Sequence, residues 1–146
     1  MNILLNKMIE EKEIIEELIN IDNEVMNTNY VFNDYLSLFN NYLNTDNKLI
    51  NVDRNIVFIT EGDVLITLDI LSRIITSNKV VIFINQGFVG MNKWLINKYC
   101  EITGNNNIMI DTDINYNKYI EKGYVVIPIG ESGIIDQVME DFYDKE

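Results

Sequence analysis

Three acidic residues stand where short apolar runs of the chain end. Glu61 follows the run 56–60, and Asp111 and Asp113 close the run that begins at Ile108. If these runs are parallel strands, their carboxyl ends share one edge of a sheet, which is where ligands bind in open parallel sheets. Carboxylates gathered there disfavour one another's ionisation unless a cation neutralises them. Such oxygen ligands suit Mg²⁺, which can stabilise the transition state of phosphodiester cleavage.

The part of the chain that must position these acids alternates short apolar runs with helical patterns. Runs of β-branched residues without polar alternation are typical of strands covered on both faces, and helices between them indicate right-handed crossovers. The fold class predicted is α/β, a Rossmann-like four-stranded parallel sheet with flanking helices. The predicted strands are 55–60, 79–84, 107–111 and 124–129, and the predicted helices are 64–76, 91–102, 114–122 and 133–143.

The first 50 residues form an N-terminal helical segment ahead of this α/β domain, which covers residues 51–146. Apolar residues recur at three- and four-residue steps over 2–26, which predicts an amphipathic helix with a bend or break near Glu10–Glu13. A second helix is predicted over 30–43, followed by a loop over 44–54. The simplest interpretation is that both helices pack on the α/β domain.

Composition narrows the chemistry that this chain can perform. Its 146 residues are 47% hydrophobic and include one cysteine, Cys100, and no histidine. Zinc sites built on histidine and Ser-His-Asp or Cys-His catalysis are therefore excluded. No apolar run approaches the ~20 residues that a membrane helix needs, and the amino terminus lacks the order of a signal peptide. We expect a folded cytoplasmic protein with no membrane partner.

The negative charge of the chain is concentrated at its two ends. The net charge is −12, of which residues 1–50 carry −6 (three Lys, nine Asp/Glu) and residues 131–146 carry −5 (one Lys, six Asp/Glu). The central residues 51–130 are close to neutral, at −1. A strongly acidic chain is repelled by a phosphate backbone, so we expect any nucleic-acid contact to need a bound metal or a basic protein partner.

The order of the motifs resembles the TOPRIM domain of topoisomerases, bacterial primases and related nucleases. It runs from an apolar strand with Glu61-Gly62, through a strand with the Gly87-Phe88 loop, to a strand with Asp111-x-Asp113. The resemblance covers about Asn55 to the carboxyl terminus and is closest to the A subunit of type IIB topoisomerases and to nuclease subunits of plasmid-defence systems. It implies that Glu61, Asp111 and Asp113 are both the Mg²⁺ ligands and the catalytic residues of a phosphodiester-cleaving site.

Two departures from the TOPRIM pattern limit what the resemblance implies. The family has Asp-x-Asp-x-x-Gly, and its glycine position is Tyr116 here. Type IIB topoisomerases also need an attacking tyrosine on a winged-helix domain, and residues 1–50 are too short and too helical to resemble one. The resemblance therefore favours a nuclease-like, accessory or decayed Mg²⁺-binding protein of nucleic-acid metabolism over a complete topoisomerase.

Each of these acids also has a purely structural explanation. Glu61 suits the first turn of the following helix, where an acid interacts favourably with the helix dipole. Asp111 and Asp113 suit a turn and the cap of the next helix. The residue types alone do not decide between a metal site and these local roles.

Two other functions fit the sequence. The β-α-β alternation loosely resembles the cofactor half of aldehyde dehydrogenases, with 130–133 (Gly-Glu-Ser-Gly) as a phosphate-binding turn, although Phe83 stands where that family has a cofactor-binding lysine. Alternatively, two acidic ends around an ordinary α/β core predict a non-enzymatic protein that binds, or inhibits, a basic partner. The substrate, the partner and the oligomeric state are not defined by the sequence.

Overall fold

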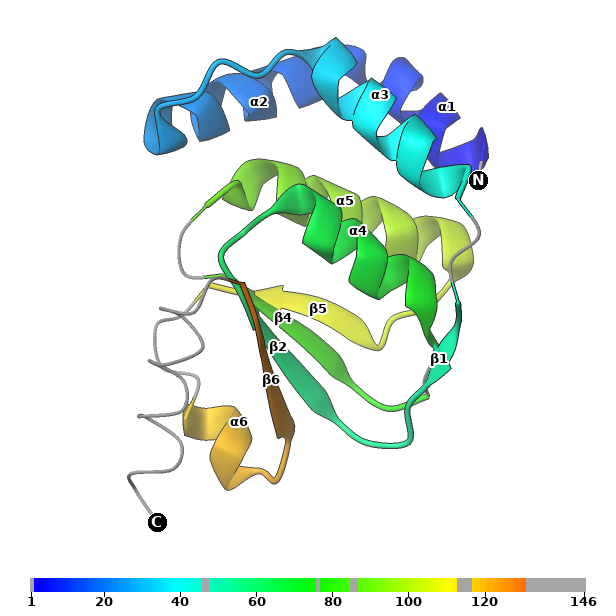
Figure 1. The fold of residues 1–146 in the computed structure, drawn as a ribbon, viewed down its shortest axis with the longest axis vertical. Coiled ribbons are helices and arrows are strands. Elements are labelled where there is room, and N and C mark those ends of the chain that lie inside the picture. The colour runs from blue at the N-terminus through cyan, green and yellow to red at the C-terminus, as the bar shows by residue number, and fades with distance from the viewer. Residues whose placement is uncertain (1, 46–47, 76, 85–86, 113–116, 131–146) are drawn as a thin grey trace.

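The central element is a sheet of four parallel strands. The computed structural model of the chain describes residues 2–45, 48–75, 77–84, 87–112 and 117–130. The strands are β2 (Ile56–Thr60), β4 (Val80–Ile84), β5 (Ile108–Asp111) and β6 (Val125–Ile129), in the order β5-β4-β2-β6 (Figure 1). The predicted α/β fold with a four-stranded parallel sheet is confirmed, and all four strand predictions agree with it to within one residue at each end.

Helices cover both faces of this sheet. On one face, α4 (Val64–Arg73) and α5 (Val89–Thr103) pack on the strand residues that include Phe58 and Ile82. On the other face, Tyr119 of α6 (Asn117–Glu121) packs on alternate residues such as Val57 and Val81. Because side chains of a strand point alternately to the two faces, continuous apolar runs are needed to fill both cores.

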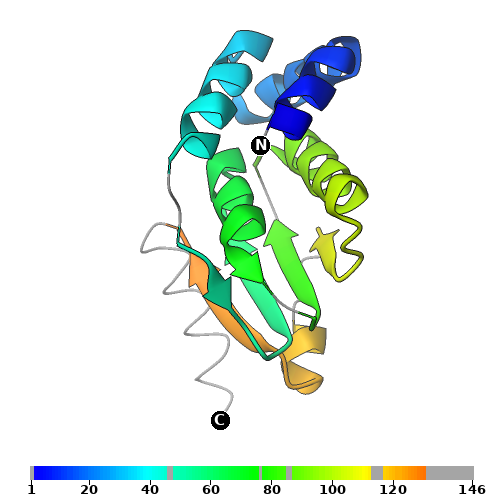
Figure 2. The same ribbon diagram turned by 90° about the vertical axis from the view of Figure 1, so that its right-hand side faces the viewer.

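The N-terminal helices form an outer layer over α4 and α5, on the side away from the sheet (Figures 1 and 2). They are α1 (Asn2–Glu10), α2 (Lys12–Met26) and α3 (Phe32–Leu43), so the predicted break near Glu10–Glu13 is confirmed at Glu11. Their buried residues belong to the same core cluster as α4, α5 and one face of the sheet: Leu4, Met8, Ile15, Ile19, Phe32, Tyr35 and Phe39. The burial of this apolar face holds the outer layer in place.

A buried acid of α2 caps α5. The carboxylate of Asp22, which is 3% exposed, accepts hydrogen bonds of 2.9 Å from the backbone N–H groups of both Gly90 and Met91. Such a cap satisfies two donors at the amino end of a helix and places a negative charge at the positive end of its dipole. A methyl group at Gly90 would lie 3.0 Å from the carboxylate oxygen, so the absence of a side chain there lets the two helices approach.

Two local predictions were wrong. Residues 74–75 were predicted to end a helix, but they form a short strand, β3 (Ile74–Ile75), that pairs with β1 (Ile50–Asn51) in a second, two-stranded parallel sheet. Two β-branched isoleucines favour that pairing over a last helical turn. The helix predicted over 91–102 begins earlier, at Val89, because Asp22 caps it before the point that the local sequence suggests.

The described helices are all too short or too polar to cross a membrane. The predicted helix 133–143 lies outside the described residues, as does the whole acidic carboxyl-terminal stretch 131–146.

Candidate functional site

Glu61 lies at the carboxyl edge of the sheet, directly after β2. Its side chain is exposed, and it enters no ion pair or side-chain hydrogen bond with any described residue. The backbone here is tightly fixed, because a methyl group at Gly87 (φ 112°) would come within 2.4 Å of the Glu61 carbonyl oxygen. The loops after β2 and β4 are therefore in direct contact, and only glycine fits at that point.

A buried amide holds the same two loops together. Asn92, which is fully buried in α5, donates hydrogen bonds of 2.8 Å to the carbonyl oxygens of both Gly62 and Phe88. Its own side-chain oxygen accepts a hydrogen bond from the Thr67 hydroxyl of α4. Because every polar atom of this amide has a partner, its burial adds order at the edge of the sheet instead of a desolvation penalty.

Asp111 has a structural role, because its side chain binds two residues of α6. Its Oδ2 atom forms an ion pair of 2.9 Å with the Lys118 ammonium group and accepts a hydrogen bond from the Tyr119 hydroxyl. Both partners lie on α6, and the Asp111 side chain is only 14% exposed. The acid therefore anchors α6 to the end of β5, and a lysine already supplies the positive charge that a metal ion would bring.

Glu61 and Asp111 share one edge of the sheet, but they do not stand side by side. They follow β2 and β5, and β4 lies between these strands. Two strand spacings separate them, which corresponds to about 10 Å across the sheet. Among the described residues no three acidic or cysteine side chains are arranged to hold a metal ion, while the third predicted ligand, Asp113, lies outside the described residues.

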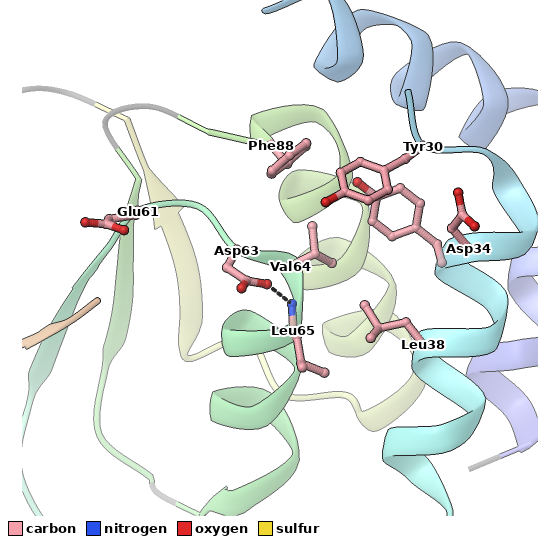
Figure 3. Close-up of a pocket in the computed structure, with 9 residues that line it drawn as sticks. Tyr30, Asp34, Leu38, Glu61, Asp63, Val64, Leu65 and Phe88 are labelled. Carbon is pink, nitrogen blue, oxygen red and sulfur yellow. Dashed lines mark hydrogen bonds between the residues drawn. The ribbon is translucent and has the colours of Figure 1, made fainter. Parts of the chain in front are cut away.

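A pocket of about 460 Å³ opens beside Glu61, between the start of α3 and the loop from β2 to α4 (Figure 3). Glu61 lies at one end, Asp34 at the opposite end and Asp63 between them. The remaining lining is aromatic and aliphatic: Tyr30, Tyr35, Leu38, Val64, Leu65 and Phe88. The N-terminal helices thus form one wall of a cavity at the ligand-binding edge of the sheet.

Two acids of the pocket also stabilise the start of a helix. Asp63 caps α4, since its Oδ1 atom accepts a hydrogen bond of 2.9 Å from the Leu65 N–H. Asp34 accepts one of 2.8 Å from the Val31 N–H through Oδ2, at the start of α3. In each case one carboxylate oxygen is used, and the other has no partner among the described residues. These acids keep a negative charge at the pocket while they stabilise the helices that form it.

Burial and charge together shift the acid–base behaviour of this region. Burial, followed by the negative charges of Asp22, Asp63 and Asp34, raises the pKa of the Tyr35 hydroxyl well above its usual range. Burial also raises the pKa of Asp22, while its two backbone hydrogen bonds counteract part of that rise. The raised pKa of Tyr35 therefore reflects its burial first and the surrounding negative charges second.

Comparisons with protein-family models, with curated proteins and with solved structures find no match to this chain.

The sequence prediction found one residue of the pocket and missed the others. Glu61 lines it, and Phe88 was noted only as part of the Gly87-Phe88 loop. Asp34 and Tyr30 carried no local signal, because their role depends on how α3 lies over α4. The phosphate-binding turn predicted at 130–133 falls outside the described residues after Gly130.

Proposed function

We propose that this protein is a binding protein that takes a positively charged partner at the carboxyl edge of its sheet. The observation that carries the proposal is the set of three carboxylates around one pocket, Asp34, Glu61 and Asp63, none of which forms an ion pair with any described Lys or Arg. Negatively charged side chains without a basic partner attract a cation, so a positively charged ligand fits this pocket better than a neutral or anionic one.

The charge of the whole chain acts in the same direction. A net charge of −12 creates a long-range negative potential that speeds the approach of basic partners and repels nucleic acid. The outer helix α2 adds exposed acids, including Glu13, Glu16 and Glu17. These surface charges steer association, while the pocket supplies the fixed contact.

The test is the binding of a fluorescent ten-residue lysine peptide, measured by anisotropy at low and high salt. A variant with Glu61→Gln and Asp63→Asn removes two pocket charges, and the asparagine retains an oxygen that can cap α4. We expect the dissociation constant to rise about tenfold, the effect of losing roughly 1.4 kcal/mol of attraction. The matched control, Glu16→Gln with Glu17→Gln, removes the same charge from exposed positions of α2. Equal weakening in both variants would show that only net charge matters.

A Mg²⁺-dependent, TOPRIM-like role in nucleic-acid metabolism is the second candidate. The observation that favours it is that Glu61 has no described partner and shares the carboxyl edge of the parallel sheet with Asp111. With Asp113, these acids would hold Mg²⁺, which would supply Lewis-acid stabilisation of a phosphodiester transition state. For this candidate, Mg²⁺ or Mn²⁺ raises the melting temperature, and Asp111→Asn with Asp113→Asn abolishes the rise. A melting temperature that does not respond to either ion removes it.

A further inference from the structure

The pocket has an aromatic wall whose rings are already held in place. The Tyr30 ring lies 5.8 Å from that of Tyr35 and 5.6 Å from that of Phe88, measured between centroids, and it meets Phe88 edge to face. Tyr30 is nevertheless 45% exposed, so part of its surface is open to a ligand. Aromatic rings fixed before binding lose little conformational entropy when a ligand arrives.

Tyr35 is more buried than Tyr30, and its hydroxyl has no partner among the described residues. Tyr35 is 5% exposed, and its hydroxyl forms no hydrogen bond with any described residue. This hydroxyl is not sealed from solvent, because Ser72 Oγ is the one fully buried side-chain polar atom without a partner in the described part of the chain. Tyr35 lines the pocket, and its hydroxyl oxygen has no described donor, so it can accept a hydrogen bond from a ligand.

The walls are apolar between the charged ends of the pocket. Leu38, Val64 and Leu65 line it together with the aromatic rings. A hydrated Mg²⁺ ion gains nothing from such surface, because it retains its waters and takes oxygen ligands. An organic cation gains twice, since aromatic faces attract its charge and aliphatic side chains cover its carbon stem.

We propose that this pocket binds a protonated alkylamine. The ammonium group would lie against the rings of Tyr30 and Phe88, donate a hydrogen bond to the Tyr35 hydroxyl, and be neutralised by the adjacent carboxylates, of which Asp63 lies midway along the pocket. The carbon stem would lie along Leu38 and Leu65. This inference rests on the proposed function, and it names the chemical class that the same site recognises.

A protonated alkylamine has two sources in a cell. One is a free amine or polyamine, and the other is a lysine side chain of a basic protein segment. A free amine would bind to the pocket alone, whereas a protein segment would also use the acidic surface around it. n-Butylammonium, as the free amine, and the ten-residue lysine peptide therefore serve as the two arms of the test.

The experiment is an NMR titration of the full chain with n-butylammonium, following the backbone amides of Leu65 and Phe88. Butan-1-ol serves as the uncharged ligand of similar shape. Tyr30→Leu should raise the dissociation constant about fivefold, which corresponds to the loss of one cation–π contact, and Tyr30→Phe should leave it within twofold. Tyr30 is half exposed, so both variants are expected to fold, and their amide spectra check this directly.

The outcomes separate the alkylamine pocket from the more general proposal that the protein binds a positively charged partner. Saturable binding of butylammonium but not of butanol, weakened by Tyr30→Leu and retained in Tyr30→Phe, supports the alkylamine pocket. If Glu61→Gln with Asp63→Asn weakens the lysine peptide while Tyr30→Leu changes no affinity, the aromatic pocket is overturned and the proposed function stands. If no cationic probe binds the original protein, or if Glu61→Gln with Asp63→Asn weakens binding no more than the Glu16→Gln and Glu17→Gln control does, both fall.

Discussion

The carboxyl ends of β2 and β5 carry the same kind of residue in different circumstances. At β2, the Glu61 carboxylate is exposed and no described residue pairs with it. At β5, the Asp111 carboxylate is mostly buried between Lys118 and Tyr119 of α6. Both acids end a parallel strand at the same edge, yet one is available for binding and the other holds the fold together.

The difference shows that the position of an acid in a sheet does not define its role. Ligands bind at the carboxyl edge of parallel sheets, and the same edge is where each strand must turn into its helix. An acid there either caps or anchors that helix or remains open to a ligand. Which of the two occurs depends on the residues of the next helix that lie against the acid. At β5 these residues include Lys118 of α6.

The largest effect on stability is expected from Asp22, whose two carboxylate oxygens both accept hydrogen bonds from α5. Asp22→Ala removes both acceptors of the α5 cap and leaves two N–H groups without partners in a buried site. The free energy of unfolding should fall by about 3 kcal/mol. Urea denaturation measures this, with Glu24→Ala, an exposed acid of the same helix, as the control. A loss below about 1 kcal/mol would mean that water or another group replaces the cap.

Asp111→Asn tests the β5 end of the comparison. In the presence of EDTA, the variant should lose about 1–2 kcal/mol of unfolding free energy, because the ion pair to Lys118 disappears and the hydrogen bond from Tyr119 weakens. An acid held in an empty metal cluster would behave in the opposite way, because its removal relieves repulsion. If Asp111→Asn is more stable than the original protein in EDTA, Asp111 is again a candidate Mg²⁺ ligand.

Alkaline pH tests the burial and the acidic surroundings of Tyr35, which lines the pocket beside the end of β2. The folded-state pKa of Tyr35 is raised above the ordinary value of 10.0, so the unfolded chain loses this proton first. Stability should therefore fall as the pH rises above about 10, by up to 1.4 kcal/mol per pH unit for this group. Tyr35→Phe should reduce the slope of unfolding free energy against pH by that amount. An unchanged slope would show that the hydroxyl titrates normally.

Glu61→Gln is expected to have the smallest effect on stability. No described side chain pairs with this carboxylate, so the free energy of unfolding should change by less than about 0.5 kcal/mol. The same urea experiment that measures Asp111→Asn gives this value. A loss as large as that of Asp111→Asn would mean that Glu61 stabilises the fold as Asp111 does, and that the two strand ends do not differ.

The sheet was predictable because its signals are local. Continuous β-branched runs, spaced by helical patterns, were enough to predict four parallel strands from Asn55 to Ile129. The short strand at Ile74–Ile75 was missed because its partner, Ile50–Asn51, lies more than 20 residues earlier and has no pattern of its own. Two-residue strands are defined by their partner more than by their sequence.

The site was less predictable because it is built from long-range contacts. Asp22 and the helix that it caps are separated by 68 residues, and no sequence spacing reports that contact. The pocket likewise combines Tyr30 of the outer layer with Glu61 of the sheet edge. Asp111 was predicted as a metal ligand because its pairing with Lys118 appears only when α6 folds back onto β5.

The most direct test of the account is the dissociation constant of n-butylammonium for two single-charge variants, measured side by side by NMR titration. Glu61→Gln and Asp111→Asn change the net charge equally, at the ends of β2 and β5. We predict that Glu61→Gln weakens binding about fivefold, while Asp111→Asn leaves it within twofold of the original protein. Equal weakening by the two variants, or a larger effect of Asp111→Asn, would contradict the assignment of the binding site to the β2 end.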